Sequence, residues 1–313
     1  MSSHFRTAAV IGTGMMGPGI AASLALGGVK PTIVSRSQEG AENGREKALA
    51  QIAVLEGNHL AAAETAERAR AEIGTSDDLD AAVAAADIVI ESAPEDLELK
   101  RKLFARIDKI AKPEAILATN TSGLSINAIA AACERPERIV TAHFWNPPHL
   151  MRLVEIVRGE RTSDATVRSL KLVLEACGKC VVVVNKDKPG QLGNRLQHAM
   201  IREALHIVAE GIADPADVDL AAREGFGLRL PVYGIFEHAD AVGLDLVLAI
   251  QDYVDQDLYN DTKAPSSVRE RVERGELGVK TGKGFYDWSE KDWEQVRQRR
   301  DAFILDFLKS RFA

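Results

Sequence analysis

Short apolar runs alternate with longer amphipathic or alanine-rich segments through the first half of the chain. The runs have the length of buried strands, and the segments between them show helical periodicity. The pattern predicts strands at 8–12, 32–34, 87–91, 115–118, 138–143, 153–157 and 181–184, and helices at 17–27, 97–110, 125–132 and 164–176. Strands that alternate with helices indicate an α/β fold with a mostly parallel, doubly wound sheet.

Residues 39–71 interrupt this alternation. They are rich in Ala, Glu, Arg and Leu and break near Gly57 and Asn58. This composition predicts a helix–turn–helix insertion that is longer than a crossover between strands requires.

The second half of the chain shows helical patterns only. They cover roughly 191–211, 215–223, 231–251, 264–274 and 290–311. We therefore predict two domains, the α/β domain over 1–186 and an all-helical domain over 187–313. The apolar share of these helices suggests that they pack against a second copy of the chain as a homodimer, in addition to forming one side of a substrate cleft.

A glycine-rich turn follows the first predicted strand. Gly12, Gly14 and Gly17 enclose Thr13, Met15 and Met16, and a helical run follows at once. Strand, Gly-x-Gly-x-x-Gly turn and helix in this order are typical of a Rossmann dinucleotide-binding site, where the helix N-terminus and the turn hold the pyrophosphate.

The end of the second strand bears on the choice of nucleotide. An acidic residue here usually binds the adenosine ribose of NAD, but Ser35 and Arg36 occupy the position. A guanidinium suits a ribose 2′-phosphate. NADP is therefore favoured and NAD stays possible, with Arg36 then stacking on the adenine or facing solvent and Glu39 serving the ribose.

Polar groups gather where later strands end, which is where α/β sheets bind ligands. His143 ends one strand, and Glu155 lies on the strand after the Pro147–Pro148 turn. Neighbouring strands would bring the two side chains together, and a carboxylate that polarises an imidazole makes it a general acid and base.

Several motifs together resemble the 3-hydroxyacyl-CoA dehydrogenase family. They are Asn120-Thr121-Ser122-x-Leu124, His143-Phe144-x-Asn146-Pro147, Leu153-Val154-Glu155-Ile156-Val157, Pro189-Gly190-x-x-x-Asn194-Arg195 and Thr281-Gly282-Lys283-Gly284-Phe285-Tyr286-Asp287.

The resemblance implies an NAD(P)-dependent oxidoreductase that interconverts a 3-hydroxy and a 3-keto group. It implies that His143 is the catalytic residue and Glu155 its partner. It also implies that Ser122 and Asn194 donate hydrogen bonds to the reacting oxygen. It places Glu95, Lys100 and Asn120 beside the cofactor, and the insertion 39–71 where the family holds coenzyme A. Fatty acid metabolism is the implied setting.

The chain departs from the family at two places. Position 35 is Ser where the family usually has an acid, and the segment after the histidine reads Asn146-Pro147-Pro148-His149. This segment is more similar to the branch that acts on small acids and alcohols, such as L-gulonate 3-dehydrogenase with lambda-crystallin and the dehydrogenases of pyridine-ring vitamin B6 breakdown. His149 would add a polar, cationic group near the pocket, or face solvent.

The substrate therefore stays open between a 3-hydroxyacyl-CoA and a small 3-hydroxy acid or alcohol. The insertion mixes both charge signs and makes no clear basic cradle for coenzyme A phosphates. Its charged residues include Arg45, Lys47, Arg68 and Arg70 beside Glu39, Glu42, Glu46, Glu56, Glu64 and Glu67.

Other interpretations exist for single residues and for the whole chain. Ser122 could cap the helix at 125–132, and Asn194 could cap the helix near 191. A non-catalytic, crystallin-like nucleotide-binding protein has no need of an intact His143 and Glu155. A lysine-dependent β-hydroxyacid dehydrogenase would carry a lysine on the helix after Pro189, where none occurs up to Glu210.

Composition and charge limit the partners, metal sites and cellular location that we expect. A formal net charge of −7 disfavours nucleic acid and anionic membranes as partners, and 46% hydrophobic with 27% charged residues fits a soluble globular protein. Three cysteines, with one Cys177-x-x-Cys180 pair, are too few for a zinc site, so no metal is expected. The first residues lack an apolar signal core, and a cytoplasmic location is the simplest expectation.

Overall fold

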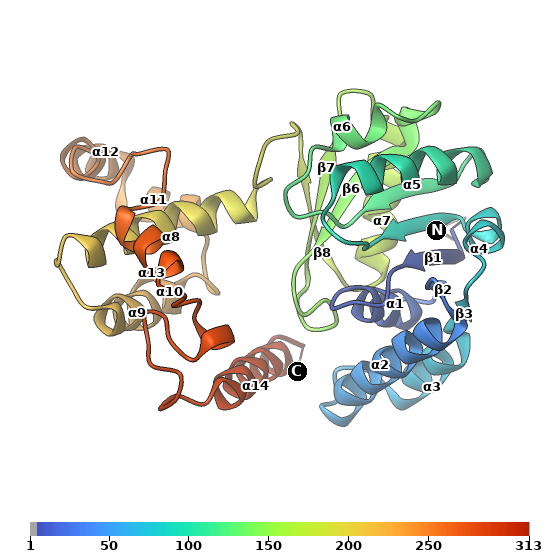
Figure 1. The fold of residues 1–313 in the computed structure, drawn as a ribbon, viewed down its shortest axis with the longest axis horizontal. Helices are drawn as coiled ribbons and strands as arrows, with labels where there is room; N and C mark the ends of the chain where they lie inside the picture. Colours follow the sequence, from blue (N-terminus) through green and yellow to red (C-terminus); the bar gives the residue numbers. More distant parts are fainter. Residues whose placement is uncertain (1–4, 313) are drawn as a thin grey trace. The chain divides into compact units, whose positions relative to one another are not determined.

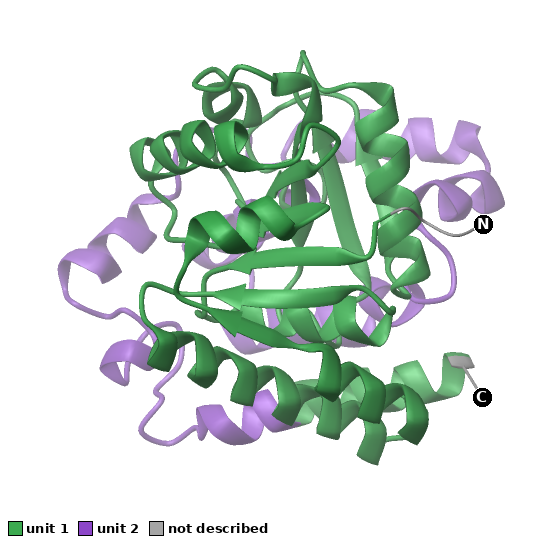
Figure 2. Ribbon diagram, turned by 90° about the vertical axis from the view of Figure 1, so that its right-hand side faces the viewer, with its two compact units in different colours: residues 1–194, 299–313 green, residues 195–298 purple. Residues whose placement is uncertain are grey.

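A computed structural model describes residues 5–312 of the chain (Figure 1). These residues form two compact units, coloured separately in Figure 2. Unit 1 consists of two stretches of the chain, the residues up to Asn194 and those from Arg299 onward, and unit 2 comprises Arg195–Gln298. No helix among the described residues has the length and apolar character that a membrane span requires.

Unit 1 is built on an eight-stranded sheet with the order β3-β2-β1-β4-β5-β6-β7-β8. Its strands are β1 Thr7–Ile11, β2 Lys30–Val34, β3 Gly74–Ser76, β4 Ile88–Glu91, β5 Ile116–Thr119, β6 Ile139–Phe144, β7 Leu153–Arg158 and β8 Cys180–Val184. The β6–β7 pair is antiparallel and every other pair is parallel. The expected doubly wound, mostly parallel sheet is confirmed.

Helices cover both faces of this sheet. They are α1 Gly17–Leu26, α2 Gln38–Gly57, α3 Ala63–Glu72, α4 Leu79–Ala85, α5 Leu97–Ile110, α6 Ile126–Ala130 and α7 Asp164–Ala176, with a 3₁₀ turn at Pro136–Arg138. Alternate residues of β1 point to opposite sides: Val10 joins one core with Leu24 of α1, and Ala9 joins the other with Phe104 of α5. This alternation explains why the central strands are apolar throughout.

The insertion forms the expected pair of helices, α2 and α3, which lie side by side in Figure 1. Ser37 caps α2 by accepting a hydrogen bond from the Gly40 N–H at 3.2 Å. Buried Ile52 of α2 and Ala66 of α3 join the core on the α1 side of the sheet. The insertion is therefore an integral layer of unit 1.

Unit 2 is helical, as expected. Its helices are α8 Gly193–Ala209, which begins at the end of unit 1, α9 Pro215–Glu224, α10 Phe226–Arg229, α11 Ile235–Val242, α12 Leu244–Val254, α13 Ser266–Glu273 and the first part of α14 Trp293–Phe312, with a 3₁₀ turn at Val279–Thr281. The single helix expected at 231–251 is interrupted at Gly243, whose φ of 97° is left-handed. None of α8 to α13 contains a buried residue.

The boundary between the units lies beyond the expected position at 186. The linker packs on unit 1, because the Gln191 side chain donates to the Thr121 carbonyl at 2.8 Å and the Leu192 and Gly193 N–H groups donate to Glu155. Unit 1 therefore keeps the chain as far as Asn194, and the end of α14 also belongs to it rather than to the helical unit.

Candidate active site and cofactor cleft

The turn between β1 and α1 depends on two of its glycines. Gly12 has a φ of 109° and donates to the Val34 carbonyl at 2.9 Å, and a Cβ there would lie 2.5 Å from the Ser92 oxygen. A Cβ on Gly17 would overlap the Gly12 carbonyl. Nothing lies within 4 Å of the Cβ position of Gly14. The turn is thus tightly packed from behind and open at Gly14, as close approach of a pyrophosphate requires.

A cleft of about 1220 Å³ opens at this turn. Of the expected cofactor residues, Gly12, Gly14, Met15, Met16, Ser35, Arg36, Glu95 and Asn120 line it, as does Ser122. The cleft extends from the end of β2 to the ends of β4 and β5, the course that a dinucleotide takes across such a sheet. Its size and its glycine turn fit this ligand.

One wall of the cleft contains residues that the sequence motifs did not predict. Asp77, Asp78 and Leu79 line it beside Arg36, and Arg106 of α5 contributes as well. Asp77 and Asp78 follow β3, the edge strand that pairs with β2. The strand Gly74–Ser76 contains no apolar run, so neither this strand nor the wall behind it was predicted as part of the site.

Lys100 lies beneath the cleft rather than on its wall, contrary to the direct cofactor contact that the resemblance implied. The side chain is 1% exposed, and its Nζ lies 2.6 Å from Glu91 Oε1 and 3.6 Å from Glu95 Oε2. Glu91 is fully buried and also accepts from Thr119 Oγ1 at 2.6 Å. The Lys100 ammonium is therefore paired with carboxylates of the protein itself.

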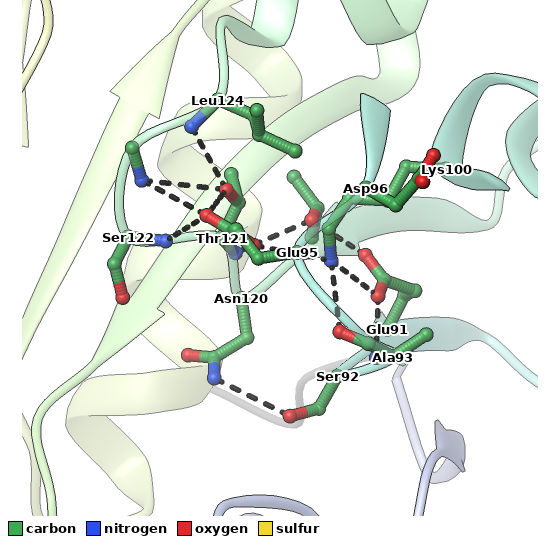
Figure 3. Close-up of polar contacts among 12 residues, drawn as sticks. Glu91, Ser92, Ala93, Glu95, Asp96, Lys100, Asn120, Thr121, Ser122 and Leu124 are labelled. Carbon is green, nitrogen blue, oxygen red and sulfur yellow. Dashed lines mark hydrogen bonds and ion pairs between the residues drawn. The ribbon is translucent and has the colours of Figure 1, made fainter. Parts of the chain in front are cut away.

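Glu95 joins this buried group to the loop that carries Ser122 (Figure 3). Its Oε1 accepts hydrogen bonds from the Thr121 hydroxyl, from the Ser122 N–H at 3.1 Å and from the Gly123 N–H at 3.2 Å. Ser125, and not Ser122, caps α6 by accepting from the Ala128 N–H. The Ser122 side chain is thus left exposed at the cleft.

His143 and Glu155 are paired as the strand pattern predicted. They lie opposite each other in the antiparallel β6–β7 register, and His143 Nδ1 is 2.7 Å from Glu155 Oε2. Both are buried, at 5% and 0% exposure. An ionised carboxylate can only accept, so Nδ1 carries the proton and Nε2 is available for chemistry.

Four N–H groups surround the Glu155 carboxylate. Oε2 accepts from His143 and from Trp145 Nε1 at 3.0 Å, and Oε1 accepts from the Leu192 N–H at 2.9 Å and the Gly193 N–H at 2.8 Å. Burial alone would raise the pKa of Glu155, but the hydrogen bonds from these groups outweigh it and lower the pKa to about 2. Glu155 is therefore ionised near neutral pH.

Asn120 and Asn194 connect this pair to the cleft. The Asn120 Oδ1 accepts from the Phe144 N–H at 2.8 Å, one residue beyond His143. Asn194 lies in the first turn of α8, and its Nδ2 donates to the Ser122 carbonyl at 3.4 Å. Contacts within unit 1 thus bring Ser122, Asn194 and the His143–Glu155 pair to the same edge of the sheet as the end of the cleft.

His149 does not join this site. It lines a separate cavity of about 410 Å³ with Lys179. Burial, with a smaller contribution from Lys179, lowers the pKa of His149 to about 4. The side chain is neutral near pH 7, so the expected cation near the substrate pocket is absent at this position.

The described residues contain no cluster of His, Cys, Asp and Glu that could hold a metal ion. Their three cysteines, Cys133, Cys177 and Cys180, are free thiols.

The fold and the cleft define a dinucleotide-binding α/β protein with a second, helical unit. The 3-hydroxyacyl-CoA dehydrogenase NAD binding domain matches residues 7–188, and the C-terminal domain of the same enzymes matches residues 190–288. The chain belongs to the 3-hydroxyacyl-CoA dehydrogenase family.

Relatives in this family differ in the substrates for which they are named. The chain is 33% identical over 298 residues to 5-formyl-3-hydroxy-2-methylpyridine 4-carboxylate 5-dehydrogenase of Mesorhizobium japonicum, covering 94% of each chain. It is 38% identical over 290 residues to a probable 3-hydroxybutyryl-CoA dehydrogenase of Bacillus subtilis, covering 90% of this chain and 97% of the relative.

A solved structure resembles nearly the whole chain. It is a 5-formyl-3-hydroxy-2-methylpyridine 4-carboxylic acid 5-dehydrogenase, described as an NAD+-dependent dismutase, with a TM-score of 0.88 and 31% identity. The match covers 98% of this chain and 97% of the other.

Proposed function

We propose that this protein is an NAD(P)-dependent dehydrogenase that interconverts a secondary 3-hydroxy group and a 3-keto group, with His143 as the general acid and base. The observation that carries the proposal is the buried His143–Glu155 pair, with Nδ1 and Oε2 2.7 Å apart, at the sheet edge where the cleft ends. A carboxylate with a strongly lowered pKa, held against an imidazole at the end of a cleft, favours a catalytic site over a non-catalytic nucleotide-binding protein.

The residues divide the proton and charge work between them. Bound nicotinamide would supply or accept the hydride. In the oxidation direction, His143 Nε2 removes the hydroxyl proton, and ionised Glu155 stabilises the resulting imidazolium. In reduction, His143 returns the proton, while the Ser122 hydroxyl and the Asn194 amide donate to the oxygen on which negative charge grows.

Substitution of His143 tests this mechanism directly. His143→Asn should lower kcat by about 10²–10⁴, the range of general acid–base catalysis, while cofactor affinity measured by NADH fluorescence stays within about twofold. Normal turnover in a folded His143→Asn variant contradicts the proposal and returns attention to a non-catalytic role.

A small 3-hydroxy acid or alcohol is the substrate class that the insertion supports. Arg45 Nε donates to the Ile73 carbonyl at 2.9 Å, and Arg70 pairs with Glu56 at 2.7 Å. Two of the four basic side chains of the insertion are thereby engaged in contacts within unit 1 instead of being available for coenzyme A phosphates. The dehydrogenase named for a pyridine carboxylate is similar to this chain over nearly its full length.

A 3-hydroxyacyl-CoA is the second candidate, favoured by the 38% identity to a probable 3-hydroxybutyryl-CoA dehydrogenase. Reduction rates with acetoacetyl-CoA and with acetoacetate and other small β-keto acids separate the two. Efficient reduction of the thioester alone makes the insertion a coenzyme A site. Activity confined to free acids or heterocyclic alcohols supports the small-substrate proposal.

NADP is the cofactor that we propose this chain prefers within an NAD-binding family. Ser35 and Arg36 line the cleft where β2 ends, and Glu39 does not line it. Arg36 is exposed there, and no salt bridge of the described residues involves it. A guanidinium in this position suits the doubly charged 2′-phosphate.

A homodimer through the helical unit is the proposed assembly. Large apolar side chains of unit 2 are exposed, among them Phe236 at 84%, Tyr253 at 81% and Leu244 at 63%. Isolated soluble proteins rarely leave so many exposed together, and a second copy would cover them.

The free cysteines support a reducing, cytoplasmic setting.

A further inference from the structure

Trp145 follows the last residue of β6, and its ring lies beside the catalytic pair. The indole Nε1–H donates to Glu155 Oε2 at 3.0 Å, the same oxygen that His143 Nδ1 contacts at 2.7 Å. The imidazole and indole ring centroids are 5.9 Å apart. An indole has one donor and no acceptor, and here it donates to the carboxylate of the pair.

The first residue of α8 fits closely against this ring. A Cβ on Gly193 would lie 2.5 Å from Cζ2 of Trp145, and the Gly193 N–H donates to Glu155 Oε1 at 2.8 Å. The start of α8 thus confines the indole on one side and anchors the carboxylate on the other. This arrangement leaves the N–H little freedom to turn away from Oε2.

We propose that Trp145 is a positioning residue of the catalytic pair, an inference that rests on the proposed role of His143. Its N–H holds Glu155 Oε2 in place beside the imidazole. It also shares with Nδ1 the negative charge of that oxygen, which would otherwise stabilise Nδ1–H alone. Each hydrogen bond to the carboxylate stabilises its negative charge, so the bond from Trp145 makes Oε2 a weaker acceptor toward the imidazolium. Trp145 therefore limits the support that Glu155 gives to the imidazolium, so that His143 can release a proton as well as accept one.

The groups that face the pair come from three elements. His143 lies on β6 and Glu155 on β7, and Trp145 follows β6. The backbone N–H groups come from Gly193, the first residue of α8, and from Leu192 just before it. Among the described residues, His143 is the group within salt-bridge distance of Glu155, and no lysine, arginine or further carboxylate acts on it as a main cause of its shift. A change at Trp145 therefore acts on the imidazole mainly through Glu155.

The test is the titration of the His143 imidazole, followed by NMR in the full-length protein without ligand and assigned by comparison with His143→Asn. Trp145→Phe keeps an aromatic ring and removes the N–H. The midpoint should rise by about 0.3–1 pH unit, because Glu155 then acts more strongly on the imidazolium. Glu155→Gln should shift it in the opposite direction, and Trp293→Phe, in α14, should leave it unchanged.

Benzothienylalanine at position 145 gives a second variant if Trp145→Phe fails to fold. It replaces the indole N–H by sulfur in a ring of nearly the same shape, and the same upward shift is expected. The proposal is overturned if, in the folded variants, the titration midpoint of His143 stays within about 0.1 pH unit of the wild-type value or moves below it.

Activity separates this inference from the proposed function. If His143 is catalytic, Trp145→Phe should also move the acidic limb of the kcat/KM profile for oxidation to higher pH, with the substrate KM changed less than kcat. An upward NMR shift without any change in the rate profile supports the role of Trp145 toward Glu155 and counts against His143 as the general base.

Discussion

Two fully buried carboxylates of unit 1, Glu155 and Glu91, have different kinds of partner. Glu155 is surrounded by four N–H groups, one of them an imidazole that can change its own charge, whereas Glu91 is paired with the permanent partner Lys100. The first arrangement can respond when a proton arrives, and the second is fixed. At the scale of single residues, this difference separates the pair that we propose to be catalytic from a structural one.

Arg36 gives the first prediction. Charge-assisted hydrogen bonds contribute about 1.5–3 kcal/mol, so Arg36→Ala should raise the KM for NADPH by about 10–100-fold and change the KM for NADH by less than threefold. Ser35→Asp should shift preference in the same direction, because its carboxylate repels the 2′-phosphate and accepts from a free ribose. Steady-state kinetics with both cofactors measure this, and an unchanged KM for NADPH in Arg36→Ala removes NADP preference from the proposal.

At the scale of elements, Lys100 connects α5 to the end of β4. Lys100→Met leaves Glu91 buried without its partner, which costs about 3–5 kcal/mol of stability. The double variant Glu91→Gln with Lys100→Met should recover more than half of this loss, because no uncompensated charge remains. Urea unfolding at pH 7 measures both. Equal losses in the single and double variants show that packing, and not charge, makes Lys100 necessary.

Asp87 connects the start of β1 to β4 and gives a pH-dependent prediction. Burial would raise its pKa, but Lys112 at 2.7 Å and the N–H groups of Arg6 and Thr7 outweigh this and lower the pKa from 3.8 to about 2. A lowered folded-state pKa stabilises the protein above the unfolded value, and that contribution fades as pH falls from about 4 toward 2. Asp87→Asn should cost about 2 kcal/mol at pH 7 and clearly less near pH 3. A pH-independent loss in urea unfolding contradicts the assignment.

The elements that could be predicted from the sequence are those with their own local signal. Apolar runs revealed the central strands, and the glycine turn located the start of α1 at Gly17. The edge strand β3 has no apolar run, because it pairs on one side only and its residues are half-buried. The interruption at Gly243 also escaped prediction, since the apolar pattern continues on both sides of it.

The site shows the same limit. Strand pairing brought His143 and Glu155 together as predicted, because their register follows from a short turn. The burial of Lys100 and the contact of Trp145 with Glu155 depend on how side chains from distant elements meet, which no local pattern records. The roles of the predicted cofactor and substrate residues stay predictions.

At the scale of the whole molecule, the two units differ in how they are stabilised. Unit 1 has two apolar clusters, one on each face of its sheet. The helices α8 to α13 contain no buried residue. Because burial of apolar surface is the main force that stabilises folded proteins, we expect unit 2 to gain stability from a partner surface, which the proposed homodimer would supply.

Sedimentation velocity at about 10–50 µM tests this assembly, with a dimer at twice the 33.9 kDa of the chain as the expected species. Phe236→Glu and Tyr253→Glu place charges on side chains that are 84% and 81% exposed in the single chain. If a second copy covers them, each substitution buries an unpaired charge and should weaken the dimer by at least about 100-fold. Leu172→Glu is the matched control, since it changes a leucine of α7 in unit 1 that is 64% exposed, and it should leave the dimer intact. A wild-type protein that sediments as a monomer over this range would show that unit 2 is stabilised without a second copy.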